Sequence, residues 1–272
     1  MTRLSQLGEL GLLAELERRG LIVGVEHDAA RVGPDLVVTQ DALVEGVHFL
    51  LDWLDWRDLG FRAAAVNLSD LAASGARPEG LLVTLAVPRE TAVEDVVSFY
   101  EGIAETGVPV VGGDTTAAAS VVVSVTALGR SDRIPGRAGA RPGDLLVVTG
   151  TLGGAGAAFR KACYLRPPLR LVEGRELAAV AHAQLDISDG VAVDAAHMAR
   201  RSGVRCVIEL DRVPLAEGAT VDDLGFGEDY ELLGAVSEAA VGTVIGRIEE
   251  GEGVELLLHG EPYELAGWQH FR

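Results

Sequence analysis

Short apolar runs alternate with longer amphipathic segments along the first half of the chain. The apolar runs are rich in Val, Leu and Ile and predict strands at 21–25, 36–39, 81–87, 108–111 and 121–128. Between them, residues 56–74 and 91–106 have the length and the apolar spacing that are typical of helices. The pattern therefore predicts strands and helices that mix within one N-terminal unit.

A break in composition interrupts this pattern at residues 131–144, where prolines and glycines cluster without apolar periodicity. We interpret the break as the connector between two domains, residues 1–133 and residues 134–272. Beyond it the pattern predicts strands at 145–149, 185–187, 204–210, 231–236 and 254–259, and helices at 153–162, 174–183, 190–201 and 239–248. Several strands follow one another too closely for a crossover helix. The expected fold class is α/β (α+β), with two mixed α/β domains.

The charge balance narrows the range of partners. Acidic residues outnumber basic ones by 41 to 23, so the formal net charge is −18 at pH 7. A chain this acidic repels nucleic acid and anionic membranes, and we expect neither as a partner. No run approaches the roughly 18 apolar residues of a membrane-spanning helix, and residues 1–20 lack the apolar core of a signal peptide. We therefore expect a cytoplasmic protein.

Lysine and cysteine usage excludes two kinds of site. Lys161 is the single lysine of the sequence and follows Arg160, so there is no phosphate-binding loop of the GxxxxGK[ST] type. Any phosphate chemistry must then use metal ions and arginines. Cys163 and Cys206 belong to no CxxC motif or His/Cys cluster, which argues against zinc and favours reduced, buried thiols.

Several aspartates stand near glycines or within otherwise apolar segments. They are Asp28, Asp41, Asp70, Asp114, Asp186 and Asp189. Mg²⁺ prefers such hard oxygen ligands on a chain that can bend closely around it. Aspartate beside glycine also makes ordinary turns and helix caps, and for any one of these residues alone that is the simpler explanation.

In three segments the sequence favours a metal or phosphate site over an ordinary turn or helix cap. Asp70 interrupts an apolar predicted helix, where a carboxylate without a partner is costly. Residues 108–116 run from a predicted buried strand into Gly-Gly-Asp-Thr-Thr, which would bring backbone N–H groups to a phosphate and a carboxylate to its metal. In 186–190, Ser188 can cap a helix that begins at Asp189, beside two carboxylates. An anion site beside carboxylates implies a cation between them.

Seven motifs occur in order along the chain. They are Asp41–Phe49, Ala65–Ala76, Gly112–Thr116, Arg137–Asp144, Val148–Gly153, Asp186–Gly190 and Gly227–Leu232. Together they closely resemble the thiamine-monophosphate kinases of the aminoimidazole-ribonucleotide-synthetase-like superfamily. The resemblance covers nearly the whole chain, and His48 with the Gly-Glu-Asp-Tyr-Glu-Leu motif is specific to this kinase branch.

The resemblance implies ATP-dependent phosphorylation of thiamine monophosphate to thiamine diphosphate. It also implies a homodimer in which the N-terminal domains join their sheets and the nucleotide lies across both domains. Carried over by position, the Mg²⁺ ligands are Asp28, Thr39, Gln40, Asp41, Asp70, Asp114, Asp186 and Asp189. By the same resemblance, ATP contacts Tyr100, Gly113, Asp114, Arg137 and Ser188. The thiamine end contacts His48, Glu228 and an aromatic residue near the C-terminus, either Trp268 or, in a strict end alignment, the position of Leu265.

The chain departs from the family pattern at two positions of the metal motifs. It has Glu26-His27-Asp28 where the family shows Gly-Asp-Asp, and Gln40 where the family shows Thr. It is also short for the family, with residues missing in its C-terminal half. One alternative is therefore a non-catalytic nucleotide- or metal-binding homodimer.

The other alternative is a synthetase of the same superfamily that activates its substrate with ATP. Such an enzyme would lack the motifs around His48 and Glu228. In the kinase reading, the attacking group is a phosphate, which is already anionic at neutral pH because its second pKa is near ~6. We therefore expect direct in-line transfer with no catalytic general base.

Overall fold

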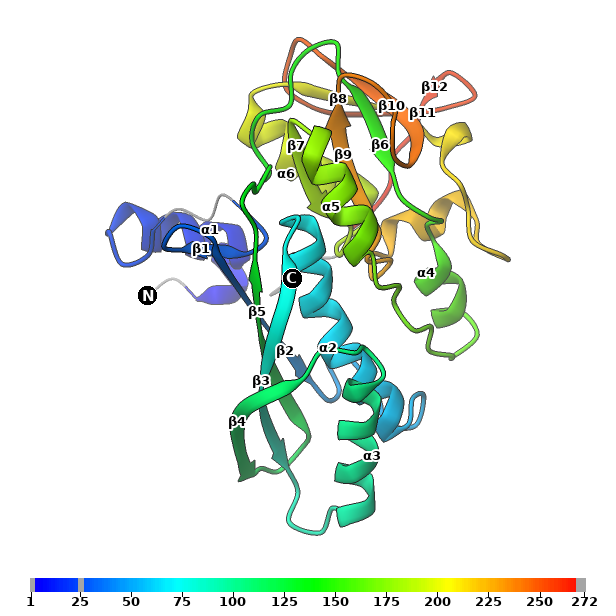
Figure 1. Ribbon diagram of the computed structural model, residues 1–272. Coiled ribbons are helices and arrows are strands. Elements are labelled where there is room, and N and C mark those ends of the chain that lie inside the picture. The colour runs from blue at the N-terminus through cyan, green and yellow to red at the C-terminus, as the bar shows by residue number, and fades with distance from the viewer. Residues whose placement is uncertain (1–2, 24–26, 268–272) are drawn as a thin grey trace.

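The computed structural model describes residues 3–23 and 27–267, which form two α/β units, drawn one above the other in Figure 1. The N-terminal unit contains the elements α1 (Leu4–Arg18), β1 (Ala30–Val32), β2 (Leu36–Val44), α2 (Trp56–Ala73), β3 (Arg77–Val87), α3 (Val93–Ala104), β4 (Val110–Ala117) and β5 (Val122–Arg130). Its strands form one sheet in the order β1-β2-β5-β3-β4. β5 pairs antiparallel with both β2 and β3, while the edge strand β4 runs parallel to β3.

Helices α2 and α3 cover one face of this sheet, as Figure 1 shows. α2 begins where the Asp55 carboxylate accepts a hydrogen bond from the backbone N–H of Asp58 at 2.8 Å, and its alanine-rich sequence favours a helix. The two helices pack closely because glycines meet backbone at their contact. A Cβ on Gly60 would lie 1.8 Å from the Phe99 carbonyl oxygen, and one on Gly102 would lie 1.9 Å from that of Arg57. Only glycine allows this approach.

The C-terminal unit contains a seven-stranded sheet in the order β12-β11-β8-β10-β6-β9-β7. Its elements are β6 (Leu145–Val148), α4 (Gly154–Phe159), α5 (Leu171–Val180), β7 (Ala183–Asp186), α6 (Val191–Ser202), β8 (Arg205–Glu209), the 3₁₀ turns Leu210–Arg212 and Val221–Gly225, β9 (Leu232–Val236), β10 (Thr243–Glu249), β11 (Gly253–Leu258) and β12 (Glu261–Pro262). Its core joins apolar residues of β6–β10 and α6, among them Leu146, Leu185 and Met198. The fold class expected from the sequence, two mixed α/β units, is confirmed.

The C-terminal half of α2 lies between the two units. The Gln184 side-chain amide of β7 donates to the carbonyl oxygens of Ala72 and Gly174, and Ser69 donates to the Asp186 carboxylate at 2.6 Å. A Cβ on Gly174 would lie 2.3 Å from the Ala72 carbonyl oxygen, so α5 also meets α2 through a glycine. These contacts fix β7 against α2. We propose that the domain boundary lies in the connector, between residues 133 and 134.

The structure corrects four expectations about local structure. The segment 239–248, predicted as a helix, contains strand β10, and residues 21–23 form no strand. Gly-Gly-Asp-Thr-Thr does not follow a strand as a loop, because Gly112–Thr116 lie within β4, where every residue is exposed. α6 begins at Val191 with Gly190 as its N-cap, so Ser188 is not the cap.

None of the helices in the described part of the chain has both the length and the apolar character needed to cross a membrane.

Candidate functional site

A cleft of about 680 Å³ lies where α2, the strand β2 and the start of the C-terminal unit meet. Of the residues expected at a site, it brings together Asp28, Thr39, Gln40, Asp41, His48, Asp70, Arg137, Asp186, Ser188, Asp189 and Glu228. These residues come from positions up to 200 residues apart in the sequence, from Asp28 to Glu228. Folding, and not local sequence, therefore builds the site.

Carboxylates crowd one end of the cleft. Burial and the charge of Asp186 raise the pKa of Asp70 well above its ordinary value, although the Thr39 hydroxyl donates to the Asp70 carboxylate. Burial, followed by the charge of Asp28, raises the pKa of Asp186 to about 7. The pKa of Asp28 is also raised by burial, against the opposing effect of Arg137. Such a set is unfavourable when fully ionised, unless cations neutralise it.

Arg137 supplies a single positive charge to this carboxylate cluster. Its guanidinium lies 2.6 Å from the Asp28 carboxylate and comes from the connector between the two sheets. One arginine cannot balance Asp28, Asp41, Asp70 and Asp186 together. Hard oxygen donors with uncompensated negative charge are the donor set that Mg²⁺ prefers, so the residues present fit a magnesium site.

A neighbouring group extends the acidic end toward α6. The ligand atoms of Asp189, Asp194 and His197 all lie within 4.8 Å of one another. The buried Asp194 carboxylate accepts the backbone N–H of Asp189 at 3.0 Å and so fixes the start of α6. Sequence reasoning missed Asp194 and His197, although their spacing of three residues on a helix places them on one face.

Gln40 borders the cleft, but its side chain is directed elsewhere. Alternation along β2 puts Thr39 and Asp41 on the face covered by α2 and Gln40 on the opposite face. There its amide donates to the Ser124 hydroxyl at 2.9 Å. The side-chain amide of Gln40 is therefore not aimed at the carboxylate cluster.

The residues expected to bind an organic substrate lie around Arg62, which precedes Asp70 by eight residues on α2, roughly 12 Å along the helix. We call this the other end of the cleft. The Nδ1 atom of His48 accepts the backbone N–H of Val44 at 3.0 Å, so the proton of the neutral ring resides on Nε2. The Glu228 carboxylate forms an ion pair with the buried Arg62 of α2. Tyr164 and Tyr230 line the same end. Sequence reasoning missed Arg62 and both tyrosines.

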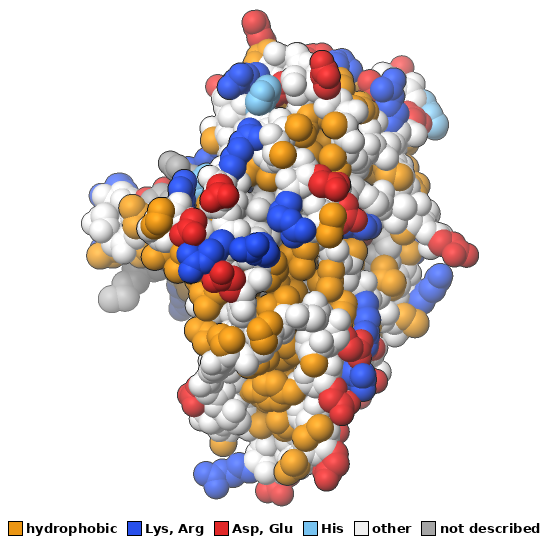
Figure 2. Space-filling view, in the orientation of Figure 1, with side chains coloured by type: hydrophobic (Ala, Val, Ile, Leu, Met, Phe, Trp, Pro, Cys, Tyr) orange, Lys and Arg blue, Asp and Glu red, His pale blue; other side chains and the backbone are white. Residues whose placement is uncertain are grey.

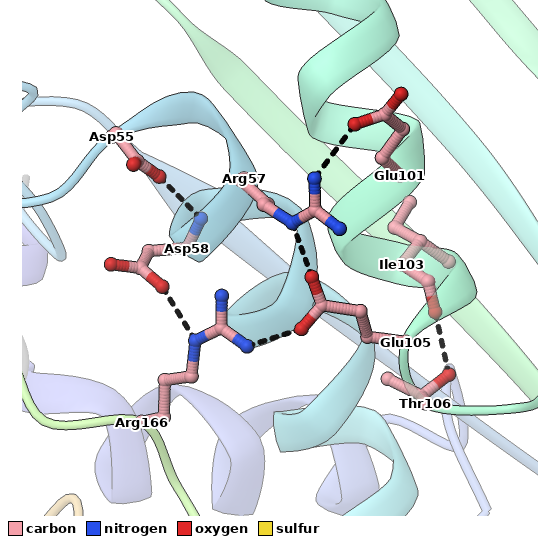
Figure 3. Close-up of polar contacts among 8 residues, drawn as sticks. All are labelled: Asp55, Arg57, Asp58, Glu101, Ile103, Glu105, Thr106 and Arg166. Carbon is pink, nitrogen blue, oxygen red and sulfur yellow. Dashed lines mark hydrogen bonds and ion pairs between the residues drawn. The ribbon is translucent and has the colours of Figure 1, made fainter.

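Residues 160–170, which we call the strap, run from α4 to α5 along this end of the cleft and supply Cys163, Tyr164, Leu165 and Pro167 to its lining. Figure 3 shows how the strap is fastened to the N-terminal unit, with Arg166 donating to Asp58 and to Glu105. Its guanidinium also lies 4.7 Å from the centroid of the Phe61 ring. The strap therefore connects the C-terminal unit to α2 and α3.

Three expected ATP residues lie outside the cleft. Tyr100 packs partly buried against the N-terminal core, with its ring 5.3 Å from that of Phe99. Gly113 and Asp114 lie on the edge strand β4, and β5 and β3 separate this strand from β2. At about 4.8 Å per strand step, β2 and β4 are roughly 14 Å apart.

The direction of the Asp114 side chain increases this separation. Asp114 is the partner of Thr84, whose side chain is on the open face of the sheet, whereas Asp41 and its partner Val125 face α2. Within one chain, Asp114 therefore does not reach the carboxylate cluster.

The chain is similar to several known proteins. Residues 26–131 match the family described as AIR synthase related protein, N-terminal domain. A thiamine-monophosphate kinase of Aquifex aeolicus (strain VF5) is 34% identical, over 99% of this chain and 100% of the relative. The chain belongs to the thiamine-monophosphate kinase family. A family member from Mycobacterium tuberculosis (strain ATCC 25618 / H37Rv) is also 34% identical, over 98% of this chain and 93% of its own length.

Solved structures agree with this family. AaThiL complexed with AMPPCP and TMP superposes with a TM-score of 0.90 at 33% identity, covering 99% of both chains. The hydrogenase maturation protein HypE, at 19% identity and a TM-score of 0.72, shares the fold alone.

The aromatic contact expected at the thiamine end is assigned to Trp268 or to the position of Leu265. Trp268 lies outside the described residues. Leu265, the alternative position, packs against the C-terminal core and does not line the cleft. Of the two thiols expected to be buried, Cys206 is buried, but Cys163 is exposed on the strap, which corrects the expectation for that residue.

Proposed function

We propose that this chain is an ATP-dependent kinase that converts thiamine monophosphate into thiamine diphosphate. The observation that carries the proposal is the cleft itself, in which a carboxylate cluster lies at one end and His48 and Glu228 at the other. The family relationship and the likeness to AaThiL in complex with an ATP analogue and TMP support the same activity. The cytoplasmic location expected from the sequence stays a prediction.

Magnesium ions belong to this proposal because the carboxylate cluster needs them. Asp28, Asp41, Asp70, Asp186 and Asp189 would hold them, with Thr39 as an additional oxygen donor. When bound, Mg²⁺ neutralises the phosphate oxygens between which a phosphoryl group moves. Gln40 stays a proposed ligand through its backbone only, because its side-chain amide is bound to Ser124.

The nucleotide end combines residues of the connector and of β7–α6. Arg137 and Ser188 line the cleft beside the carboxylate cluster, and a guanidinium is the group best shaped to bind a phosphate. We propose that Tyr100, Gly113 and Asp114 act on the cleft of a second copy in a homodimer. The separation of β4 from the cleft of its own chain and the full exposure of β4 support this arrangement for Gly113 and Asp114.

The open side of the N-terminal sheet supports the homodimer as well. Figure 2 shows hydrophobic side chains gathered over the lower part of the molecule, where β3, β4 and α3 lie. Exposed apolar residues there are Leu82 on β3 and Val110 and Val111 on β4, while the exposed Val93 and Val97 belong to α3 on the covered side of the sheet. An unpaired edge strand beside exposed apolar side chains favours association with a second copy.

The chain's own residues position the two phosphates and need not move a proton. The acceptor is a phosphate oxygen that is already anionic at neutral pH. His48 donates from Nε2 at the substrate end and so orients the acceptor, while Arg137 holds the donor phosphates. Transfer between two held phosphates is direct and leaves no phosphorylated protein residue.

The experiment is to measure ADP release with thiamine monophosphate, with unphosphorylated thiamine and without an acceptor. We expect ADP release that depends on thiamine monophosphate. ADP release independent of this acceptor would favour the synthetase alternative. Nucleotide binding without ADP release would favour the non-catalytic homodimer.

A further inference from the structure

Arg62 is a buried cation that the phosphate chemistry does not use. It is 7% exposed and lines the cleft together with Val66 and Asp70, which follow it at intervals of four residues on α2. Residues four apart share one face of a helix, so these three form a stripe along the cleft. Asp70 and Arg62 are roughly 12 Å apart along the helix at 1.5 Å per residue. They therefore contact different parts of a ligand that spans the cleft.

The partner of Arg62 is held rigidly. Glu228, which forms the ion pair with Arg62, has a φ of 62°, a left-handed conformation that is unfavourable for a residue other than glycine. Two backbone hydrogen bonds of 2.8 Å maintain it, from Glu228 N–H to the Ser188 carbonyl and from Tyr230 N–H to the Ile187 carbonyl. The Tyr230 hydroxyl lies 3.4 Å from the Glu228 carboxylate. The carboxylate is thus presented in one orientation.

Two polar atoms beside this ion pair lack a partner. Arg62 Nε and the Tyr164 hydroxyl are buried and have no hydrogen bond to any residue that the structure describes. The Arg62 guanidinium carbon lies 5.5 Å from the centroid of the Tyr164 ring, which places both groups in one recess. A buried donor without a partner destabilises the protein, so a ligand that accepts a hydrogen bond here gains affinity.

We propose that Arg62 is the specificity-determining residue of this recess, where Arg62 and Glu228 together bind the edge of an aminopyrimidine ring. The proposal rests on the proposed function, because thiamine monophosphate carries a 4-aminopyrimidine. Its exocyclic amine donates to the Glu228 carboxylate, and the adjacent ring nitrogen accepts from the Arg62 guanidinium. The 4-oxo analogue, oxythiamine monophosphate, has an acceptor and a donor in the reverse order and mismatches both groups.

The experiment compares dissociation constants for thiamine monophosphate and oxythiamine monophosphate by calorimetry, with Mg²⁺ and AMPPCP present. Wild type should prefer the amino ligand by about 100-fold or more, since two hydrogen bonds to charged groups are mismatched in the oxo ligand. In Arg62→Met this preference should fall by about tenfold or more, and in Arg62→Lys it should fall less, because one donor is kept. The affinity for AMPPCP should stay unchanged in both.

Arg57→Met is the matched control. Arg57 lies on the same helix but is paired with Glu101 and Glu105 outside the cleft, so this variant should keep the wild-type preference. An unchanged preference in Arg62→Met, even with weaker binding of both ligands, would overturn the inference. If Arg62→Met does not fold, Glu228→Gln is tested instead and should reduce the preference for thiamine monophosphate over oxythiamine monophosphate. An unchanged preference in Glu228→Gln would also overturn the inference.

ADP release in the same preparations separates this inference from the proposed function. Selective binding without ADP release would contradict the kinase activity and support the role of Arg62. ADP release without selectivity would support the kinase activity and contradict the role of Arg62.

Discussion

Asp70 shows at the scale of one residue how an unfavourable position indicates function. Its carboxylate is placed by Thr39 in a cluster where burial and the charge of Asp186 both raise its pKa. An ionised carboxylate at this position destabilises the folded protein, and a bound cation explains why it is there. The sequence already indicated this role, since Asp70 interrupts an apolar helix.

Replacing Asp70 should separate stability from activity. Asp70→Asn should reduce turnover by about 100-fold or more, since it removes a proposed metal ligand, and should raise the melting temperature of the metal-free protein. Initial rates and thermal melts in EDTA test this. Near-normal turnover at saturating Mg²⁺ would contradict the assignment, as would a fall in the metal-free melting temperature.

The raised pKa values also predict a pH dependence of stability. Asp186, with its pKa raised to about 7, keeps a proton in the folded chain that the unfolded chain has released above about pH 4. The folded state therefore binds more protons in this range, and metal-free stability falls as pH rises toward 7.

Mg²⁺ should restore the stability that is lost as pH rises, because the cation neutralises the carboxylates that protons neutralise at lower pH. At about 100 times its dissociation constant it should raise the melting temperature by about 5 °C or more at pH 8, and by less at pH 5.5. Calorimetric melts at the two pH values measure the effect. An equal increase at both values, or none at pH 8, would contradict a magnesium-binding carboxylate cluster.

At the scale of elements, the strap decides the shape of the substrate end of the cleft. Arg166 fastens it to α2 and α3 through Asp58, Glu105 and the ring of Phe61. Exposed ion pairs and a cation–π contact of this kind each contribute little to stability. The strap is therefore held firmly enough to shape the pocket and weakly enough to be released by one substitution.

Arg166→Met should raise the KM for thiamine monophosphate by about fivefold or more, while kcat and the KM for ATP stay within about twofold. Steady-state kinetics with each substrate varied in turn measure this. The control is Arg130→Met, which removes a comparable exposed arginine paired with Asp35 and Glu79 on the N-terminal sheet. Equal increases in both KM values, or no change in either, would show that the strap does not shape the substrate end.

The elements that the sequence predicted well are those with strong periodicity. α2 was expected at 56–74 and runs from Trp56 to Ala73, because its caps and apolar spacing act locally. β10 was missed because its residues, 243–249, become a strand only by pairing between β8 and β6. Pairing partners distant in sequence leave no local signal. For the same reason the site aspartates were found by motif, whereas Arg62 looked like a single charge on a helix.

At the scale of the whole molecule, the position of Asp114 requires a second copy if it acts on ATP. It lies on the open face of the edge strand β4, away from the cleft of its own chain. Sheets that join across a two-fold axis would bring it toward the partner's cleft. We therefore expect a homodimer in sedimentation at micromolar concentration, and a monomer there would contradict the arrangement.

Subunit mixing tests the shared site directly. Asp70→Asn and Asp114→Asn should each be inactive alone, but equal mixing and re-association should restore about a quarter of wild-type activity, because half the dimers are mixed and each mixed dimer has one intact site. Wild type taken through the same mixing procedure is the control. If mixing restores no activity, the shared site is contradicted: Asp70 and Asp114 would then act in the site of one chain, or Asp114 would belong to no site.

The transfer of labelled phosphate tests the central claim most directly. Protein is incubated with ATP labelled in its γ-phosphate, thiamine monophosphate and Mg²⁺, and the products are separated. We predict that the label appears in thiamine diphosphate in a one-to-one ratio with ADP, and that none stays on the protein. Label in inorganic phosphate alone, or covalently on a protein side chain, would contradict a direct kinase acting on thiamine monophosphate.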